Sequence, residues 1–117
     1  MDRVNRISYF VFRMENKEKI KSFTDLRAWK EGHKLVLTVY NASDTFPQKE
    51  MFGLTSQMRR AAISITSNMA EGFSRATAKD KHNFYCMAQG SLTELQNQLL
   101  VARDVLYLDK DMFKKNC

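Results

Sequence analysis

Apolar residues recur at steps of three and four along most of this chain, which is the spacing of one face of an α-helix. The first such run predicts a helix over about residues 25–41, with Thr24 or Asp25 placed to cap its first turn. Its expected core-facing residues are Leu26, Trp29, His33, Val36 or Leu37, and Tyr40.

Two further apolar runs follow, each preceded by turn-forming residues. The earlier run predicts a helix over 54–73, whose expected core residues are Leu54, Met58, Ala61, Ile65, Met69 and Gly72. The later run predicts the longest helix, over 78–107, with Thr77 and Asp80 in the positions of a capping box. Its expected core residues are Phe84, Ala88, Ser91, Leu95, Leu99, Ala102 and Leu106.

A repeat of three and four favours helices that pack side by side, as in up-down bundles. The sequence therefore predicts an all-α fold, an antiparallel up-down helical bundle of the four-helix type, over residues 23–117. A fourth helix is expected to start from residue 110, and because the sequence ends at Cys117 we expect this helix to be truncated or missing. The three long helices could form a bundle alone, or a neighbouring subunit could complete the four-helix arrangement.

The first part of the chain, residues 1–22, lacks a helical stripe, and we expect it to be a poorly ordered N-terminal extension. Alternation around Ile7, Tyr9 and Val11 leaves an edge strand as the alternative.

Composition narrows the class of protein. The 117 residues suffice for one domain, and Gly 4 with Pro 1 disfavours folds rich in tight turns. Two cysteines cannot form the multi-bridge framework of a small secreted protein, and no stretch approaches the roughly 18 apolar residues of a membrane span. We therefore expect a cytoplasmic protein without a membrane partner.

A second, polar row runs beside the apolar stripe of the helix predicted over 54–73. It consists of Gln57, Arg60, Ser64, Asn68 and Glu71, and the next helix adds Ser91 and Glu94. Glu94 lies on an otherwise uncharged flank, so we expect it to be partly buried and paired with Arg60, because a buried charge needs a partner. The sequence thus predicts a structural polar network between these two helices.

The residues suited to chemistry do not form a catalytic or metal-binding set. Glu71 and Glu94 could act as an acid/base pair, but no nucleophile, metal cluster or phosphate loop accompanies them. His82 and Cys86 are spaced as two metal ligands, whereas structural zinc needs four. We therefore expect no enzymatic activity, no metal and no other cofactor, with an exposed His82 above a buried thiol.

Positive charge favours a polyanionic partner. The chain has 19 basic and 13 acidic residues, a net charge of +6 and a pI near 9.5. Arg59, Arg75, Lys79 and Lys81 concentrate around the second helix and the turn after it, and form the candidate nucleic-acid-binding set. An ordinary solvated face is the alternative, and repetition around a symmetric oligomer would strengthen the field.

Several short motifs in this order resemble one family. They are residues 23–29, Phe46-Pro47 with Glu50, residues 52–54, Gln57 with Arg60-Ala61, Ser64-Ile65, residues 68–72, Gly90-Ser91 with Glu94-Leu95, and Gln98-Leu99. Over about residues 23–108 the chain resembles the four-helix bundle proteins encoded within intervening sequences of bacterial 23S ribosomal RNA genes. The same fold class includes the accessory variability proteins of diversity-generating retroelements.

The resemblance implies an antiparallel four-helix bundle that assembles as a ring-shaped homopentamer, with a basic surface for nucleic acid and no established enzymatic activity. Our leading hypothesis is therefore a non-enzymatic, oligomeric protein that binds RNA or DNA. The alternative is a structural module that assembles with a protein partner such as a reverse transcriptase. The chain departs from the family pattern by its segment before Met14 and by ending where the fourth helix should begin.

Overall fold

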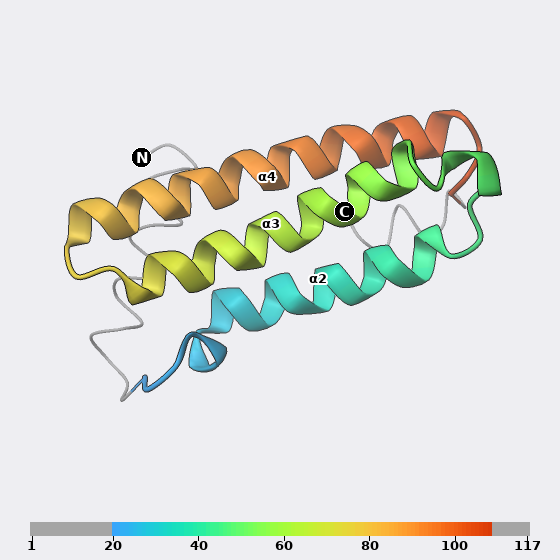
Figure 1. The fold of residues 1–117 in the computed structure, drawn as a ribbon. Coiled ribbons are helices and arrows are strands. Elements are labelled where there is room, and N and C mark those ends of the chain that lie inside the picture. The colour runs from blue at the N-terminus through green and yellow to red at the C-terminus, as the bar shows by residue number, and fades with distance from the viewer. Residues whose placement is uncertain (1–19, 109–117) are drawn as a thin grey trace.

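The computed structural model describes residues 20–108, in which three α-helices run side by side (Figure 1). The elements are η1 (Phe23–Asp25), α2 (Arg27–Ser43), η2 (Gln48–Glu50), α3 (Leu54–Ser74) and α4 (Ala78–Asp104), where η marks a short 3-10 turn. The fold is all-α and up-down, as the sequence predicts, and α3 lies between α2 and α4 and packs against both. The fourth helix expected from residue 110, and most of the N-terminal extension, lie outside the described residues.

Within residues 20–108, none of the helices combines the length and the apolar character that crossing a lipid bilayer requires.

The start of α2 differs from the prediction that Thr24 or Asp25 caps this helix. Ser22 caps the preceding turn η1 instead: its hydroxyl accepts a hydrogen bond from the Thr24 amide at 3.3 Å. The Asp25 carboxylate in turn accepts from the Ser22 amide at 3.2 Å, which completes a capping box. Leu26 occupies the N-cap position of α2 and makes no cap bond, because a leucine side chain has no acceptor; instead it is buried in the core with Tyr85.

The two ends of α4 are held in different ways. At its start, the Thr77 hydroxyl accepts a hydrogen bond from the Asp80 amide at 3.1 Å, which confirms Thr77 as the cap. Within residues 20–108 the Asp80 carboxylate accepts no bond in return, so the predicted capping box is only half formed. At its end, Leu106 has a φ of 68°, and the amides of Leu106 and Tyr107 donate to the carbonyls of Arg103 and Ala102. This is the Schellman pattern, which stops the helix. Leu106 is therefore 79% exposed, and its predicted place in the core is wrong.

The core gathers around α3. Its buried side chains are Met58, Ala61, Ala62, Ile65 and Met69. The residues that meet them are Val36 and Val39 from α2, with Ala88, Leu95 and Ala102 from α4. These residues form one continuous apolar cluster, which is the main source of stability for a small domain.

The buried face of α2 is only partly the predicted one. Val36 is buried as predicted, together with Gly32 and Val39, whereas His33, Leu37 and Tyr40 are exposed. Gly32 allows α2 to approach α3 closely, because a Cβ at this position would lie 3.0 Å from Cγ2 of Thr66. The helical period alone did not distinguish the two faces, since apolar residues lie on both.

A close contact between α3 and α4 lies near the turn that joins them. Gly72 is buried there against Tyr85, and a Cβ on Gly72 would lie 2.6 Å from Cε1 of Tyr85 and 3.0 Å from Cβ of Phe84. A contact under 3.0 Å requires either the buried Tyr85 ring or the helix backbone to shift. The missing side chain of Gly72 therefore sets how closely α3 and α4 pack.

We expect Gly72→Ala to lower the free energy of unfolding by roughly 1–3 kcal/mol, because overpacking outweighs the better helix propensity of alanine. Gly90→Ala is the matched control, since nothing lies within 4 Å of the added Cβ and Gly90 is exposed on α4. This control should stabilise the protein by about 0.5–1 kcal/mol. Urea unfolding measures both, and equal effects of the two variants would contradict this account of the α3–α4 contact.

A hydrogen bond joins the segment after α4 to the segment before α3. The Tyr107 hydroxyl donates to Oε2 of Glu50 at 2.9 Å, and Oε1 of Glu50 accepts from the Leu54 amide at 3.3 Å. The bond to Glu50 raises the pKa of Tyr107 above its ordinary value of 10.0, and desolvation and the Glu50 charge add to this effect.

Because the folded pKa is raised, the contribution of neutral Tyr107 to stability is present below about pH 10 and is lost as pH rises through the folded pKa. We expect Glu50→Gln to lower the Tyr107 pKa, since it removes the neighbouring charge. NMR of tyrosine labelled at Cζ, assigned with Tyr107→Phe, measures this shift. The remote variant Glu31→Gln should leave the titration midpoint of Tyr107 unchanged. If Glu50→Gln also left this midpoint unchanged, Glu50 would not be the cause of the raised pKa.

Candidate functional site

The structure places the four predicted basic residues in two separate regions. Arg59 lies in the first half of α3, whereas Arg75 follows the last residue of that helix. Sixteen residues of helix at 1.5 Å each put the two about 24 Å apart along the axis. Lys79 and Lys81 lie in the first turn of α4, across the short α3–α4 connection from Arg75. The structure thus brings three of the four together and leaves Arg59 apart.

Arg59 joins α2 to α3. Its Nε donates to the Ser43 hydroxyl at 2.9 Å, and its Nη2 donates to the Tyr40 carbonyl and to Oδ1 of Asp44, each at 3.4 Å. Its guanidinium also lies 4.6 Å from the centre of the Tyr40 ring, and its side chain is only 21% exposed. These contacts give Arg59 a structural role, because its donors are directed at the neighbouring helix.

Lys81 covers the end of α3. Its Nζ donates to the Phe73 carbonyl at 2.7 Å and to the Gly72 carbonyl at 3.4 Å. The last carbonyls of a helix lack partners within the helix and carry partial negative charge, so a cation is favourable there. The same ammonium lies 5.2 Å from the centre of the Phe73 ring. Lys81 therefore neutralises the negative end of α3.

Arg75 and Lys79 are the members of the set whose side chains reach solvent. The Arg75 side chain is 46% exposed, lies 3.9 Å from Oε2 of Glu71 and stacks 4.5 Å from the centre of the Phe84 ring. Lys79 is exposed in the first turn of α4. The Phe84 ring holds the Arg75 guanidinium at the surface, where an anionic ligand can reach it.

Sequence analysis missed two basic residues at the same end of the bundle. Arg27 and Lys30 are exposed in the first turns of α2, and Figure 1 shows the start of α2 at the same end as the α3–α4 turn. The up-down topology would have predicted this, because the first helix must start where the second ends. We call Arg27, Lys30, Arg75 and Lys79 the basic end.

Part of the predicted polar network joins α3 and α4. The Ser64 and Ser91 hydroxyls lie 2.7 Å apart, and Nδ2 of Asn68 donates to the Ser64 hydroxyl at 3.1 Å and to the Ser64 carbonyl at 2.8 Å. The Ser64–Ser91 contact fixes the register of the two antiparallel helices. Glu94 then lies level with Ala61 and about 15 Å along the axis from Glu71, so the two glutamates do not form an acid/base pair.

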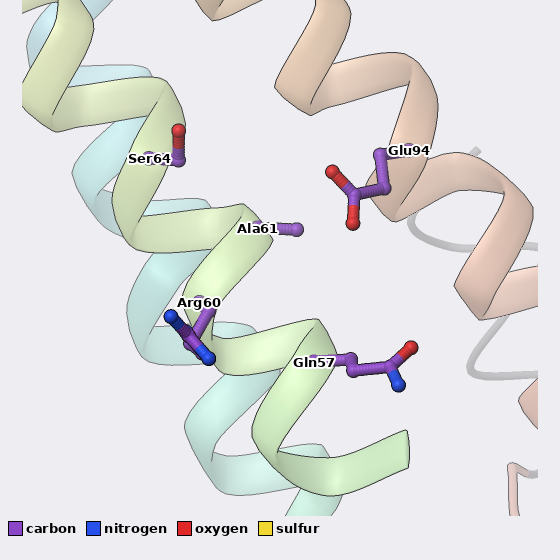
Figure 2. Close-up of a pocket in the computed structure, with 5 residues that line it drawn as sticks. All are labelled: Gln57, Arg60, Ala61, Ser64 and Glu94. Atoms are coloured by element: carbon purple, nitrogen blue, oxygen red, sulfur yellow. The ribbon is translucent and has the colours of Figure 1, made fainter. Parts of the chain in front are cut away.

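The predicted pairing of Arg60 with Glu94 is wrong. Both residues are exposed, and no ion pair joins them in the part of the chain that the structure describes. Oε1 of Glu94 accepts instead from Nε2 of Gln98 at 3.1 Å. Figure 2 shows the Arg60 side chain on the side of α3 away from Glu94. Since both charges reach water, neither requires a partner.

A hollow of about 370 Å³ lies between α3 and α4 at this point. The residues that line it are Gln57, Arg60, Ala61, Ser64 and Glu94 (Figure 2). We call it the α3–α4 groove.

His82 and Cys86 lie one turn apart on α4, and Nε2 of His82 is 3.3 Å from Sγ of Cys86. Both side chains are half-buried, so neither the expected exposed histidine nor the expected buried thiol is observed. Among the described residues, no group of three or more histidine, cysteine or acidic side chains is arranged to hold a metal ion.

We expect Arg59→Ala to lower the free energy of unfolding by about 1.5–3 kcal/mol, because it removes charge-assisted hydrogen bonds between α2 and α3. Arg75→Ala should cost under about 1 kcal/mol, since its ion pair is exposed and weak. Thermal or urea unfolding of both variants measures the difference. An equal loss of stability in the two variants would show that the contacts of Arg59 stabilise the fold no more than the exposed ion pair of Arg75 does.

Comparison with known proteins identifies the family. No curated protein matches the chain. A family model described as 23S rRNA-intervening sequence protein matches residues 24–117, which include all three α-helices, the basic end and the α3–α4 groove. The chain therefore belongs to the 23S rRNA-intervening sequence protein family.

Proposed function

We propose that this protein is a non-enzymatic, oligomeric nucleic-acid-binding protein that contacts RNA or DNA through the basic end. The observation that carries this proposal is the gathering of exposed cations at one end of the bundle, where Arg75 and Lys79 lie beside the start of α2. The net charge of +6 supports it, as does a family named for an intervening sequence in ribosomal RNA.

The helix ends add to the positive field at the basic end. Both α2 and α4 begin there, and the first amides of a helix carry partial positive charge. The end of α3 would oppose them with its carbonyls, but Lys81 binds those carbonyls. A phosphate approaching this end meets cationic side chains and two helix N-termini, which favour anions. It also meets the exposed carboxylates of Asp80, in the first turn of α4, and of Glu71, 3.9 Å from the Arg75 guanidinium, and these reduce the positive field. Contacts of the cations with phosphate supply affinity without reading a base sequence.

Exposed apolar residues support the proposed oligomer. The family resemblance implies that this oligomer is a homopentamer. Leu37 and Tyr40 are exposed on α2, Met87 and Val101 are exposed on α4, and Val105 is exposed at the C-cap of α4. Apolar surface of this kind is typical of contacts between protein chains. In a ring, each copy would repeat the basic end and strengthen its field. The cytoplasmic location of the protein stays a prediction.

The same apolar surface supports a second candidate function. A structural module that assembles with another protein, such as a reverse transcriptase, would also use exposed apolar residues of α2 and α4. The two functions differ in their response to salt, because only phosphate binding releases condensed counterions.

We expect the double variant Arg75→Ala, Lys79→Ala to bind a structured RNA more weakly and with a smaller salt dependence. Each lost phosphate contact should reduce the slope of log K against log salt by about 0.7–0.9, so the double variant should lose roughly 1.4–1.8. Fluorescence anisotropy between 50 and 200 mM salt measures both quantities. The control double variant Lys34→Ala, Lys49→Ala removes the same charge from exposed sites outside the basic end.

Two results would contradict the proposal. An absence of binding to any polyanion at low salt would rule out the nucleic-acid function. Equal slopes in the two double variants would show that binding depends on net charge and not on the basic end.

A further inference from the structure

Two aromatic rings stack in parallel on α2. The centres of the Trp29 and His33 rings lie 4.8 Å apart, and the angle between the ring planes is 11°. The two residues are four apart in the sequence, so they are neighbours on one side of the helix. Trp29 is half-buried and His33 is exposed, so the Trp29 ring covers one face of the imidazole and water reaches the rest. We call this pair the α2 ring stack.

The ring stack is held in place by the core. Trp29 packs against both apolar clusters of the described residues. The edge of one ring in the Phe23–Trp29 pair meets the face of the other, with 5.3 Å between the centres and an angle of 66°. Because Trp29 is fixed on these sides, it fixes the imidazole that stacks on it. A flat ligand that binds to His33 therefore loses little affinity to the ordering of the protein.

Cations of the basic end lie beside the ring stack. Lys30 is exposed three residues before His33, about one helical turn away, and Arg27 is exposed one turn nearer the start of α2. Glu31 is the one acidic residue of α2. It is two residues from His33, so it does not share the same side of the helix, and its carboxylate lies 3.5 Å from the Lys34 ammonium. The surface beside the stack is therefore cationic.

We propose that the α2 ring stack binds an unpaired nucleobase of a single-stranded segment of RNA or DNA, whose phosphates contact the basic end. This inference rests on the nucleic-acid function proposed above and specifies its substrate class. Proteins that bind single strands combine cations that follow the backbone with aromatic rings on which the bases stack. A base inside a regular duplex cannot use the stack, because it is already paired and covered by its neighbours.

The test uses two single strands with the same phosphates. One is a short oligothymidylate, and the other is an abasic strand of the same length, which carries the sugars and phosphates without the bases. Fluorescence anisotropy of the full chain should show oligothymidylate bound at least about fivefold more tightly than the abasic strand, because only the first can stack on His33.

Two variants at His33 separate the ring from its charge and its nitrogens. His33→Ala should remove the preference for oligothymidylate and leave the affinity for the abasic strand nearly unchanged, which also shows that the variant is folded. His33→Phe supplies a ring that carries neither charge nor nitrogen, and should keep the preference. The double variant Arg75→Ala, Lys79→Ala should weaken the binding of both strands alike, because it removes phosphate contacts.

The possible failures of this inference and of the proposed function are distinguishable. Equal affinities of the wild type for the two strands, or an equal effect of His33→Ala on both, would overturn the ring-stack site and leave the binding of phosphates by the basic end intact. A His33→Phe variant that behaves like His33→Ala would also overturn it, since the ring would not be the group recognised. An absence of binding to both strands would overturn this inference together with the function on which it rests.

Discussion

The close packing of α3 against α4 is the interaction on which the rest of the structure depends. Gly72 has no side chain to separate the helices where Tyr85 is buried, and the Ser64 and Ser91 hydroxyls meet further along. Two fixed points along a pair of helices determine their register and spacing. That register decides which side chain of α4 lies level with which side chain of α3.

The packing also divides the charged residues into two groups: those that bond to a neighbouring element, and those whose charge stays exposed to water. Arg59 and Lys81 donate to groups on neighbouring elements, because carbonyls and hydroxyls between packed helices need donors. Arg75 and Glu94 keep exposed charge, since their positions face water. The basic end is therefore built from charges that the packing leaves at the surface, and the Phe84 ring holds one of them, Arg75, in place.

Local patterns predicted the helices because their causes lie within a few residues. The 3.6-residue period marked α2, α3 and α4, and Thr77 marked the start of α4 through a bond to an amide three residues away. Family membership followed from motifs in sequence order, which need no geometry. The buried face of α2 was predicted only in part, because apolar residues recur at the helical period on two of its faces. Gly32 packs closely against Thr66 on the face that is buried.

The sequence by itself determined the helical class, the family, the excess of positive charge and the residues of the polar row, because each depends on residue type and spacing along one helix. Only the tertiary structure decided the roles of those residues. Whether Arg60 meets Glu94, or whether Arg59 faces solvent or α2, depends on lateral distances and side-chain directions between helices. A hydrogen bond requires its donor and acceptor to lie within about 3 Å of each other. The spacing of residues along one helix does not determine, to that precision, where the side chains of a neighbouring helix lie.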